Sequence, residues 1–314
     1  AALATTPWEL FEEIAVDDVR GACDVFRSVY DASHGADGFV SIEVSPAVAH
    51  DTAATVAEAR RIWGRVERPN VMIKVPGTAA GTPAVRELIA LGINVNITLL
   101  FAVNAHRRVI DAYLEGLEVR AEAGEDISHV ASVASFFVSR VDTAIDARLD
   151  ALAKDGAIDA ARAQSLKGKA AIANAKLAYA LARETFSGER WRKLAVMGAR
   201  MQRPLWASTS TKNPAYRDVI YVEQLIGPDT VNTLPPATLE AFRDHGETSR
   251  TVDAGRAEAM RQLADLASAG ISLDAVTDQL LAEGLASFQK SFDTLLAGLE
   301  HKSRALGRQL VGSR

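Results

Sequence analysis

Two kinds of segment alternate along the chain up to about residue 240. Short apolar runs rich in β-branched residues are separated by longer stretches in which apolar residues recur every three or four positions. Strands that alternate with helices pair in parallel, so this pattern predicts an α/β fold with crossover helices. The predicted strands are Phe39–Val44, Val71–Val75, Asn94–Leu99, His129–Ala134, Pro204–Ala207 and Val231–Leu234, and the predicted helices include Asp51–Val66, Pro83–Leu91, Ala105–Ala121 and Pro214–Leu225.

The periodic stretches lengthen toward the C-terminus, and no strand is expected beyond Thr238. The chain has no low-complexity linker, internal repeat or break in composition. We therefore expect one domain over residues 1–314, with strands within about 39–234 and a helical C-terminal wrap within about 238–308. The longer predicted helices are Thr143–Ala153, Ala160–Phe186, Arg250–Ser268 and Leu273–Leu306.

The composition is that of an ordinary globular protein. The 314 residues include 35 Lys and Arg against 40 Asp and Glu, a net charge of −5, and 48% are hydrophobic, which excludes a wholly disordered chain. An acidic chain lacks the basic surface that nucleic acid requires, so no nucleic-acid partner is expected. The single cysteine, Cys23, fits a reducing compartment.

No segment has the pattern of a membrane span or a secretory signal. The longest uncharged stretch, Leu88–Ala105, is interrupted by Asn94, Asn96 and Asn104, whose amides would be buried in hydrocarbon. The N-terminal segment has neither a basic region nor an apolar core. We expect a cytoplasmic protein without a membrane partner, and the sequence leaves a homodimer open.

Two predicted strands each carry one ionisable residue among apolar neighbours. Lys74 stands between Ile73 and Val75; an amine in such surroundings loses its proton more readily, and the neutral amine attacks carbonyls to form Schiff bases. A nearby Glu43 could relay protons, directly or through a water. The alternatives are a lysine that reaches solvent from a strand end and a carboxylate paired with an arginine.

Asn96 and Thr98 share one face of their strand. They would bind substrate hydroxyls or a catalytic water, unless they only satisfy backbone groups at the strand end.

A candidate anion site follows the later strands. It consists of Arg140 and the segment Ser208–Asn213, before a helix expected to begin at Pro214, because hydroxyls, cations and a helix N-terminus bind phosphate well. For Arg140 the alternative is a salt bridge to Asp142 or Asp146. The six histidines lack metal-ligand spacing, and no nucleotide-binding or hydrolase motif is present, so no metal site is expected.

Five segments together resemble the transaldolase family: SIEVSPAVAHDT, VMIKVPGTAAG, GINVNITLLF, SFFVSR and STSTKN. They occur in the family's order, from about Thr6 to the C-terminus. The resemblance implies a TIM-type (α/β)8 barrel, of which about six strands are recognisable here, and class I aldol chemistry without a metal or organic cofactor.

The resemblance also implies catalytic roles. Lys74 matches the lysine that forms the Schiff base, and Glu43 matches the glutamate that works through a catalytic water. Thr98 matches the residue that holds this water, and Phe137 the aromatic residue beside the imine.

The remaining matches concern substrate binding. Asn96 and Ser135 match residues that hold the dihydroxyacetone end of the sugar. Arg140 and Ser210 match the phosphate-binding pair, joined by Lys212 where the family often has arginine. Lysine keeps the charge but loses the bidentate fork, so weaker phosphate binding is expected.

The implied reaction transfers a dihydroxyacetone unit from a ketose phosphate to an aldose phosphate, in the non-oxidative pentose phosphate pathway. The donors would be sedoheptulose 7-phosphate or fructose 6-phosphate, and the acceptors glyceraldehyde 3-phosphate or erythrose 4-phosphate. Two alternatives remain: simple cleavage, as in a fructose-6-phosphate aldolase, and a catalytically impaired sugar-phosphate binder.

The chain departs from the family pattern at its start. Family members begin with two further strands, the first of which carries an acid/base aspartate, and no equivalent is recognisable here. Asp17 and Asp18 lie in a segment that is predicted to be helical, so neither is assigned that role. Two alternatives follow: the chain is a fragment of a longer transaldolase, or its barrel is incomplete and has an exposed edge.

Overall fold

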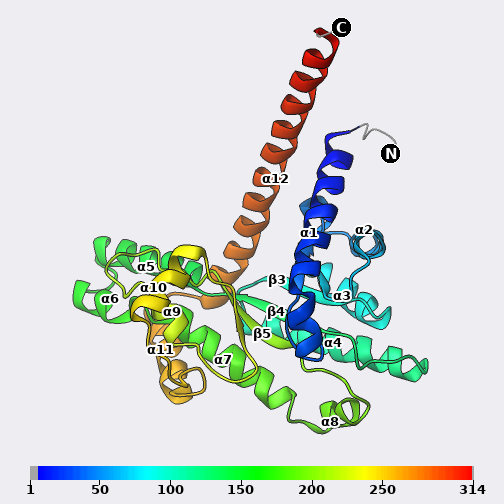
Figure 1. The fold of residues 1–314 in the computed structure, drawn as a ribbon. Helices are drawn as coiled ribbons and strands as arrows, with labels where there is room; N and C mark the ends of the chain where they lie inside the picture. The colour runs from blue at the N-terminus through cyan, green and yellow to red at the C-terminus, as the bar shows by residue number, and fades with distance from the viewer. Residues whose placement is uncertain (1–5, 313–314) are drawn as a thin grey trace.

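The computed structural model describes residues 6–312. Within them, six parallel strands form one sheet in the order of the sequence, which confirms the predicted α/β fold (Figure 1). Each end strand pairs on one side only among these residues, so the sheet is an open half-barrel. The strands are β1 (Val40–Glu43), β2 (Val71–Pro76), β3 (Val95–Leu100), β4 (Ser132–Phe137), β5 (Arg203–Ala207) and β6 (Val231–Asn232).

The predicted strands match the sheet to within two residues at each end, except at β4; the last strand ends at Asn232 instead of Leu234. The sequence pattern suggests His129–Ala134, whereas the strand begins three residues later. The difference arises because Asp126 holds a turn at these positions: its carboxylate accepts a 2.8 Å hydrogen bond from the Ser128 N–H and lies 3.1 Å from Nδ1 of His129. Ser135 and Phe137 therefore lie within the strand.

Most helices pack on the outer face of the sheet, where the main core lies, whereas Ala22 and Phe26 of the first helix line the concave side. Val71, Ile73 and Val75 alternate toward this core, so Met72 and Lys74 face the concave side.

None of the helices in residues 6–312 combines the length and the hydrophobicity that a membrane span requires. The helices are α1 (Pro7–Ala32), η1 (Pro46–Val48, a 3₁₀ turn), α2 (Thr52–Val66), α3 (Gly81–Ala90), α4 (Val103–Glu122), α5 (Ser139–Lys154), α6 (Ala160–Leu166), α7 (Ala170–Thr185), α8 (Glu189–Val196), α9 (Ile220–Glu223), α10 (Pro236–His245), α11 (Arg256–Ser268) and α12 (Leu273–Gly312).

Three helix predictions need correction. The helix predicted over Arg250–Ser268 begins only at Arg256, after Gly255, where φ is +74°. The stretch Ala160–Phe186 forms two helices, α6 and α7, because the chain turns at Gly168, where φ is +68°. The helix predicted over Pro214–Leu225 is reduced to the single turn of α9. Side-chain bonds stabilise turns there instead: Thr211 Oγ1 donates to the Asp218 carbonyl at 2.9 Å.

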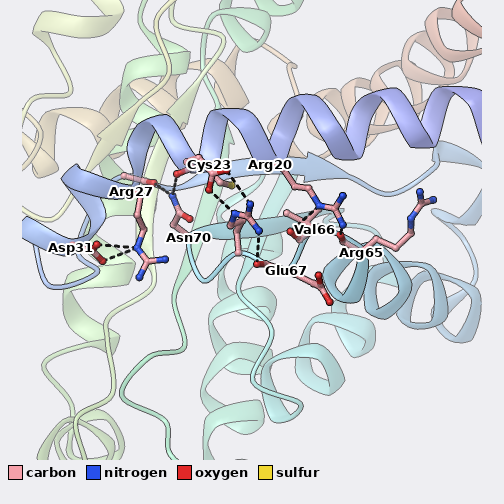
Figure 2. A network of polar contacts seen from close by, with 11 residues as sticks. Arg20, Cys23, Arg27, Asp31, Arg65, Val66, Glu67 and Asn70 are labelled. Atoms are coloured by element: carbon pink, nitrogen blue, oxygen red, sulfur yellow. Dashed lines mark hydrogen bonds and ion pairs between the residues drawn. The ribbon is translucent and has the colours of Figure 1, made fainter. Parts of the chain in front are cut away.

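The helix α1 is fixed to the first strands by buried polar bonds. Asn70, just before β2, donates from Nδ2 to the carbonyls of Cys23 and Gly38, at 2.9 Å each (Figure 2). Arg20 donates from Nε to the Val66 carbonyl at the end of α2, at 3.3 Å. Asp17 and Asp18 lie within α1, which confirms the helical prediction; both are exposed, and neither lines the cavity on the concave side of the sheet.

The long helix α12 runs beside α1 and then projects away from the body of the protein (Figure 1). Aromatic rings join the two helices: the Phe292 ring lies 5.4 Å from that of Trp8 and 5.2 Å from that of Phe11, measured between centroids. These edge-on contacts connect the beginning of the described chain to its last helix.

Candidate active site

The concave face of the sheet encloses a cavity of about 520 Å³. Polar side chains from four neighbouring strands point into it toward the carboxyl ends of the strands, where barrel enzymes of this type place their chemistry. They are Ser41 and Glu43 from β1, Lys74 from β2, Asn96 and Thr98 from β3, and Ser135 from β4, with Phe137 beside them.

Lys74 and Glu43 form an ion pair in this cavity. They are direct partners in the parallel register of β1 and β2, and Nζ of Lys74 lies 3.1 Å from Oε2 of Glu43. Their side chains are 29% and 17% exposed, so the amine keeps access to the cavity. Burial raises the pKa of Glu43, although the nearby Lys74 opposes this shift. The alternative of a carboxylate–arginine pair does not hold, because the partner of Glu43 is Lys74.

The side chain of Asn96 on β3 forms hydrogen bonds with a serine on β1 and a serine on β4. Its Oδ1 accepts a 2.7 Å hydrogen bond from Ser135 Oγ, and its Nδ2 donates to Ser41 Oγ at 3.0 Å. The partners of its side chain are thus other cavity side chains, not backbone groups. Asn94, by contrast, donates to the carbonyls of Pro69 and Val71 and has a structural role.

Ser41 was not singled out from the sequence. The signal was present, because Ser41 precedes Glu43 by two positions and so shares its face of β1. Arg203, at the start of β5, also lines the cavity and was missed, since nothing near it in the sequence suggests a site.

Two of the anion-site candidates line a second cavity. Arg140 and Lys212 both line a space of about 570 Å³ between α5 and α12. Phe137 connects the two cavities: its side chain lines the first, and the Arg140 guanidinium lies over its ring, 5.7 Å from the centroid. Ser210 accepts a 2.8 Å hydrogen bond from Nζ of Lys212.

Two expectations about this anion site are corrected. No helix begins at Pro214, so the site lacks the helix N-terminus predicted for it. Asp142 and Asp146 accept hydrogen bonds from Tyr221 and Tyr216 instead of pairing with Arg140. The guanidinium of Arg140 thus remains exposed at the mouth of the second cavity.

Comparison with known proteins identifies the family. The sequence model of the family described as transaldolase/fructose-6-phosphate aldolase matches residues 1–299. The chain belongs to this family.

Characterised relatives support the same assignment. The chain is 51% identical over 304 residues to transaldolase 2 of Nostoc sp., an alignment that covers 95% of this chain and 80% of the relative. It is 53% identical over 284 residues to a transaldolase of Mycolicibacterium smegmatis, covering 90% and 75% of the two chains. Transaldolase 1 of Streptomyces avermitilis is 52% identical over 308 residues, covering 98% and 80%. This similarity indicates transaldolase function, that of an enzyme of the transferase class.

Proposed function

We propose that this chain transfers a dihydroxyacetone unit between sugar phosphates through a Schiff base on Lys74. The observation that carries the proposal is the Lys74–Glu43 pair, 3.1 Å apart, in a cavity whose lining also includes several hydroxyls and an amide. An amine beside a carboxylate can attack a ketone and have its protons moved by the neighbouring group.

The reaction would proceed by one covalent intermediate. The amine of Lys74 adds to C2 of a ketose phosphate, such as fructose 6-phosphate, and loss of water gives an iminium ion. The C4 hydroxyl then gives up its proton, through a water, to Glu43; the C3–C4 bond breaks, its electron pair passes to the iminium, and an aldose phosphate leaves. The three-carbon enamine attacks the aldehyde of a second aldose phosphate, and hydrolysis of the new iminium frees Lys74. Glu43, working through a water held by Thr98, would move protons in the addition and hydrolysis steps.

The polar residues of the cavity suit the three-carbon unit. The hydrogen-bonded set of Ser41, Asn96 and Ser135 offers a fixed array for the hydroxyls at C1 and C3. Phe137 would cover the imine and limit its contact with water, which favours transfer over hydrolysis.

The second cavity suits the phosphate. In a ketose phosphate the ketone and the phosphate lie at opposite ends of the molecule, and the two adjoining cavities separate Lys74 from Arg140 and Lys212 in the same way. We assign Arg140, Ser210 and Lys212 to phosphate binding. This substrate class places the enzyme in the non-oxidative pentose phosphate pathway, and such charged substrates together with the free thiol of Cys23 favour the cytoplasm.

Trapping the covalent intermediate tests the proposal. The protein is incubated with fructose 6-phosphate and borohydride, and the adduct is located by peptide mass. We expect one adduct, on Lys74, absent from Lys74→Ala and present in the control Lys193→Ala, whose target is an exposed lysine of α8. The absence of an adduct at Lys74 would refute the proposal.

A second measurement separates transfer from simple cleavage. Turnover of fructose 6-phosphate is followed with and without erythrose 4-phosphate. Transaldolase function requires that turnover depend on the acceptor. Acceptor-independent release of dihydroxyacetone would instead identify an aldolase, and an adduct without turnover a binding protein.

A further inference from the structure

Two aspartates one turn apart on α5 make the same pair of contacts. Asp142 and Asp146 are 1% and 9% exposed. Each accepts one backbone N–H from the junction of α6 and α7 and one tyrosine hydroxyl from the segment that follows β5.

The contacts of Asp142 involve its two carboxylate oxygens separately. Oδ1 accepts the N–H of Ala171 at 2.7 Å, and Oδ2 accepts the hydroxyl of Tyr221 at 2.8 Å. Asp146 repeats this arrangement: Oδ1 accepts the N–H of Gly168 at 3.1 Å, and Oδ2 the hydroxyl of Tyr216 at 2.5 Å. Hydrogen bonds to a buried carboxylate are among the stronger ones in proteins, so both tyrosines are held firmly.

The tyrosines belong to the segment that carries Ser210 and Lys212. At its beginning, the Ser208 carbonyl accepts the N–H of Ser139, the first residue of α5, at 3.0 Å. At its far side, Tyr216 and Tyr221 bind the aspartates of the same helix. The phosphate-binding candidates thus lie on a loop attached to α5 at both ends, and Arg140 lies on α5 between these attachments.

Lys212 also lies close to the buried pairs. It lines a small cavity of about 150 Å³ together with both aspartates and both tyrosines. Lys212 thus lies beside the aspartate–tyrosine pairs, and its amine donates a hydrogen bond to Ser210.

We propose that the pairs Asp142–Tyr221 and Asp146–Tyr216 form a clamp that positions Ser210 and Lys212 opposite Arg140 and thereby sets the affinity for the substrate phosphate. This inference rests on the proposed function. The four residues are positioning residues, because the clamp acts through the loop and does not touch the sugar.

The break between α6 and α7 is part of this clamp. A Cβ atom at Gly168 would lie 2.7 Å from Cζ of Tyr216, so only glycine leaves room for the ring, and its φ of +68° suits glycine. A continuous helix, as the sequence pattern suggests, would also keep the N–H groups of Gly168 and Ala171 for its own bonds.

Removing each hydroxyl tests the clamp. Tyr216→Phe and Tyr221→Phe should each raise the KM for fructose 6-phosphate and the Ki of inorganic phosphate by about tenfold, the effect of one strong hydrogen bond. The kcat at saturation should change less than about twofold, because Lys74 and Glu43 are untouched. Borohydride trapping of unphosphorylated dihydroxyacetone on Lys74 should be unchanged, since this ligand has no phosphate.

Tyr113→Phe is the matched control. Tyr113 is also buried, and its hydroxyl donates to the Arg200 carbonyl at 2.6 Å, away from both cavities. It should lower the melting temperature without changing KM or Ki. Gly168→Ala provides a second variant that displaces Tyr216 without removing any polar group, and it should raise KM in the same way.

Two results would overturn the clamp in an otherwise active enzyme. One is an unchanged KM and Ki in both tyrosine variants and in Gly168→Ala. The other is an equal loss toward phosphorylated and unphosphorylated ligands, which indicates a general structural role. Failure of the proposed function would be seen separately, as the absence of trapping and turnover in the unmodified chain.

Discussion

Nζ of Lys74 and Oε2 of Glu43 lie 3.1 Å apart because their residues are partners in the register of two adjacent parallel strands. The distance between the two groups is therefore set by the spacing of β1 and β2, not by a loop. Proton transfer between these side chains can therefore recur in every turnover with little rearrangement. Replacing Glu43 should slow the turnover.

Glu43→Gln should lower kcat by about 10²- to 10⁴-fold, the usual contribution of a general acid–base group. Burial raises the pKa of Glu43. As the pH is lowered, the carboxylate in the unmodified enzyme should therefore take up a proton, and the rate should fall, at a higher pH than for an ordinary glutamate. This acidic limb should disappear from the pH–rate profile of the variant, while borohydride still traps Lys74.

The control for this substitution is Glu58→Gln. Burial also raises the pKa of Glu58, but this residue of α2 accepts a hydrogen bond from the Ser45 N–H, 2.8 Å away, and does not line the cavity. Its kcat should stay within about twofold of the unmodified enzyme. An acidic limb that persists in Glu43→Gln would assign that limb to another group.

Lys212→Arg should strengthen phosphate binding. Arginine offers a planar fork that contacts two phosphate oxygens at once, whereas Lys212 presents a single ammonium, which now contacts Ser210. We expect the KM for fructose 6-phosphate and the Ki of inorganic phosphate to fall by about three- to tenfold. Lys212→Ala should raise both values. If Lys212 binds phosphate, the two variants must change KM and Ki in opposite directions.

Asp142 should make stability depend on pH. Burial raises its pKa to about 6, although the bonds from Ala171 and Tyr221 oppose the shift. A carboxyl group with a raised pKa in the fold contributes stability that is present below its ordinary pKa near 4 and is lost as the pH rises through 6. This loss corresponds to about 3 kcal/mol.

Asp142→Asn should remove that dependence, because an amide does not ionise. Urea unfolding at several pH values would show a smaller decline in the free energy of unfolding between pH 4 and 7 for the variant than for the unmodified protein. Parallel pH profiles for the two proteins would contradict the raised pKa.

Gly116→Ala should destabilise the protein. Gly116 lies where α4 crosses α3, and a Cβ atom there would come within 2.6 Å of the Arg86 carbonyl oxygen. The helices must separate, at a cost of about 1–3 kcal/mol in the free energy of unfolding. Gly64→Ala, on the exposed side of α2 with no atom near the new methyl group, should instead stabilise by up to about 1 kcal/mol. Equal effects of the two substitutions on urea unfolding would show that the helix crossing is not the cause.

The strands were predictable because burial on a parallel sheet leaves a strong sequence signal. Runs such as that ending at Val75 are nearly continuous in apolar residues, so the ionisable Lys74 stood out against them. Period two then placed Asn96 and Thr98 on one face. These residues do share one cavity in the structure.

The phosphate side was less predictable because tertiary contacts determine it. Helical periodicity continues through Gly168, and the sequence gives no sign that N–H groups at the turn there bind the distant Asp142 and Asp146. Tyr216 and Tyr221 likewise carry no local signal of their partners on α5. Patterns along the sequence describe neighbours within an element, whereas a loop takes its shape from residues far away in the chain.

The ring contacts of Trp8 with Phe292 join residues from nearly opposite ends of the sequence. Closing so long a loop costs entropy, which favours late formation of this contact during folding. Most side chains of α12 between residues 293 and 304 are exposed, so this part of the helix belongs to the region that should open first when the native protein fluctuates. The amide protons of α1 and α12 near the contact of Trp8 with Phe292 should therefore exchange with solvent well before those of the sheet.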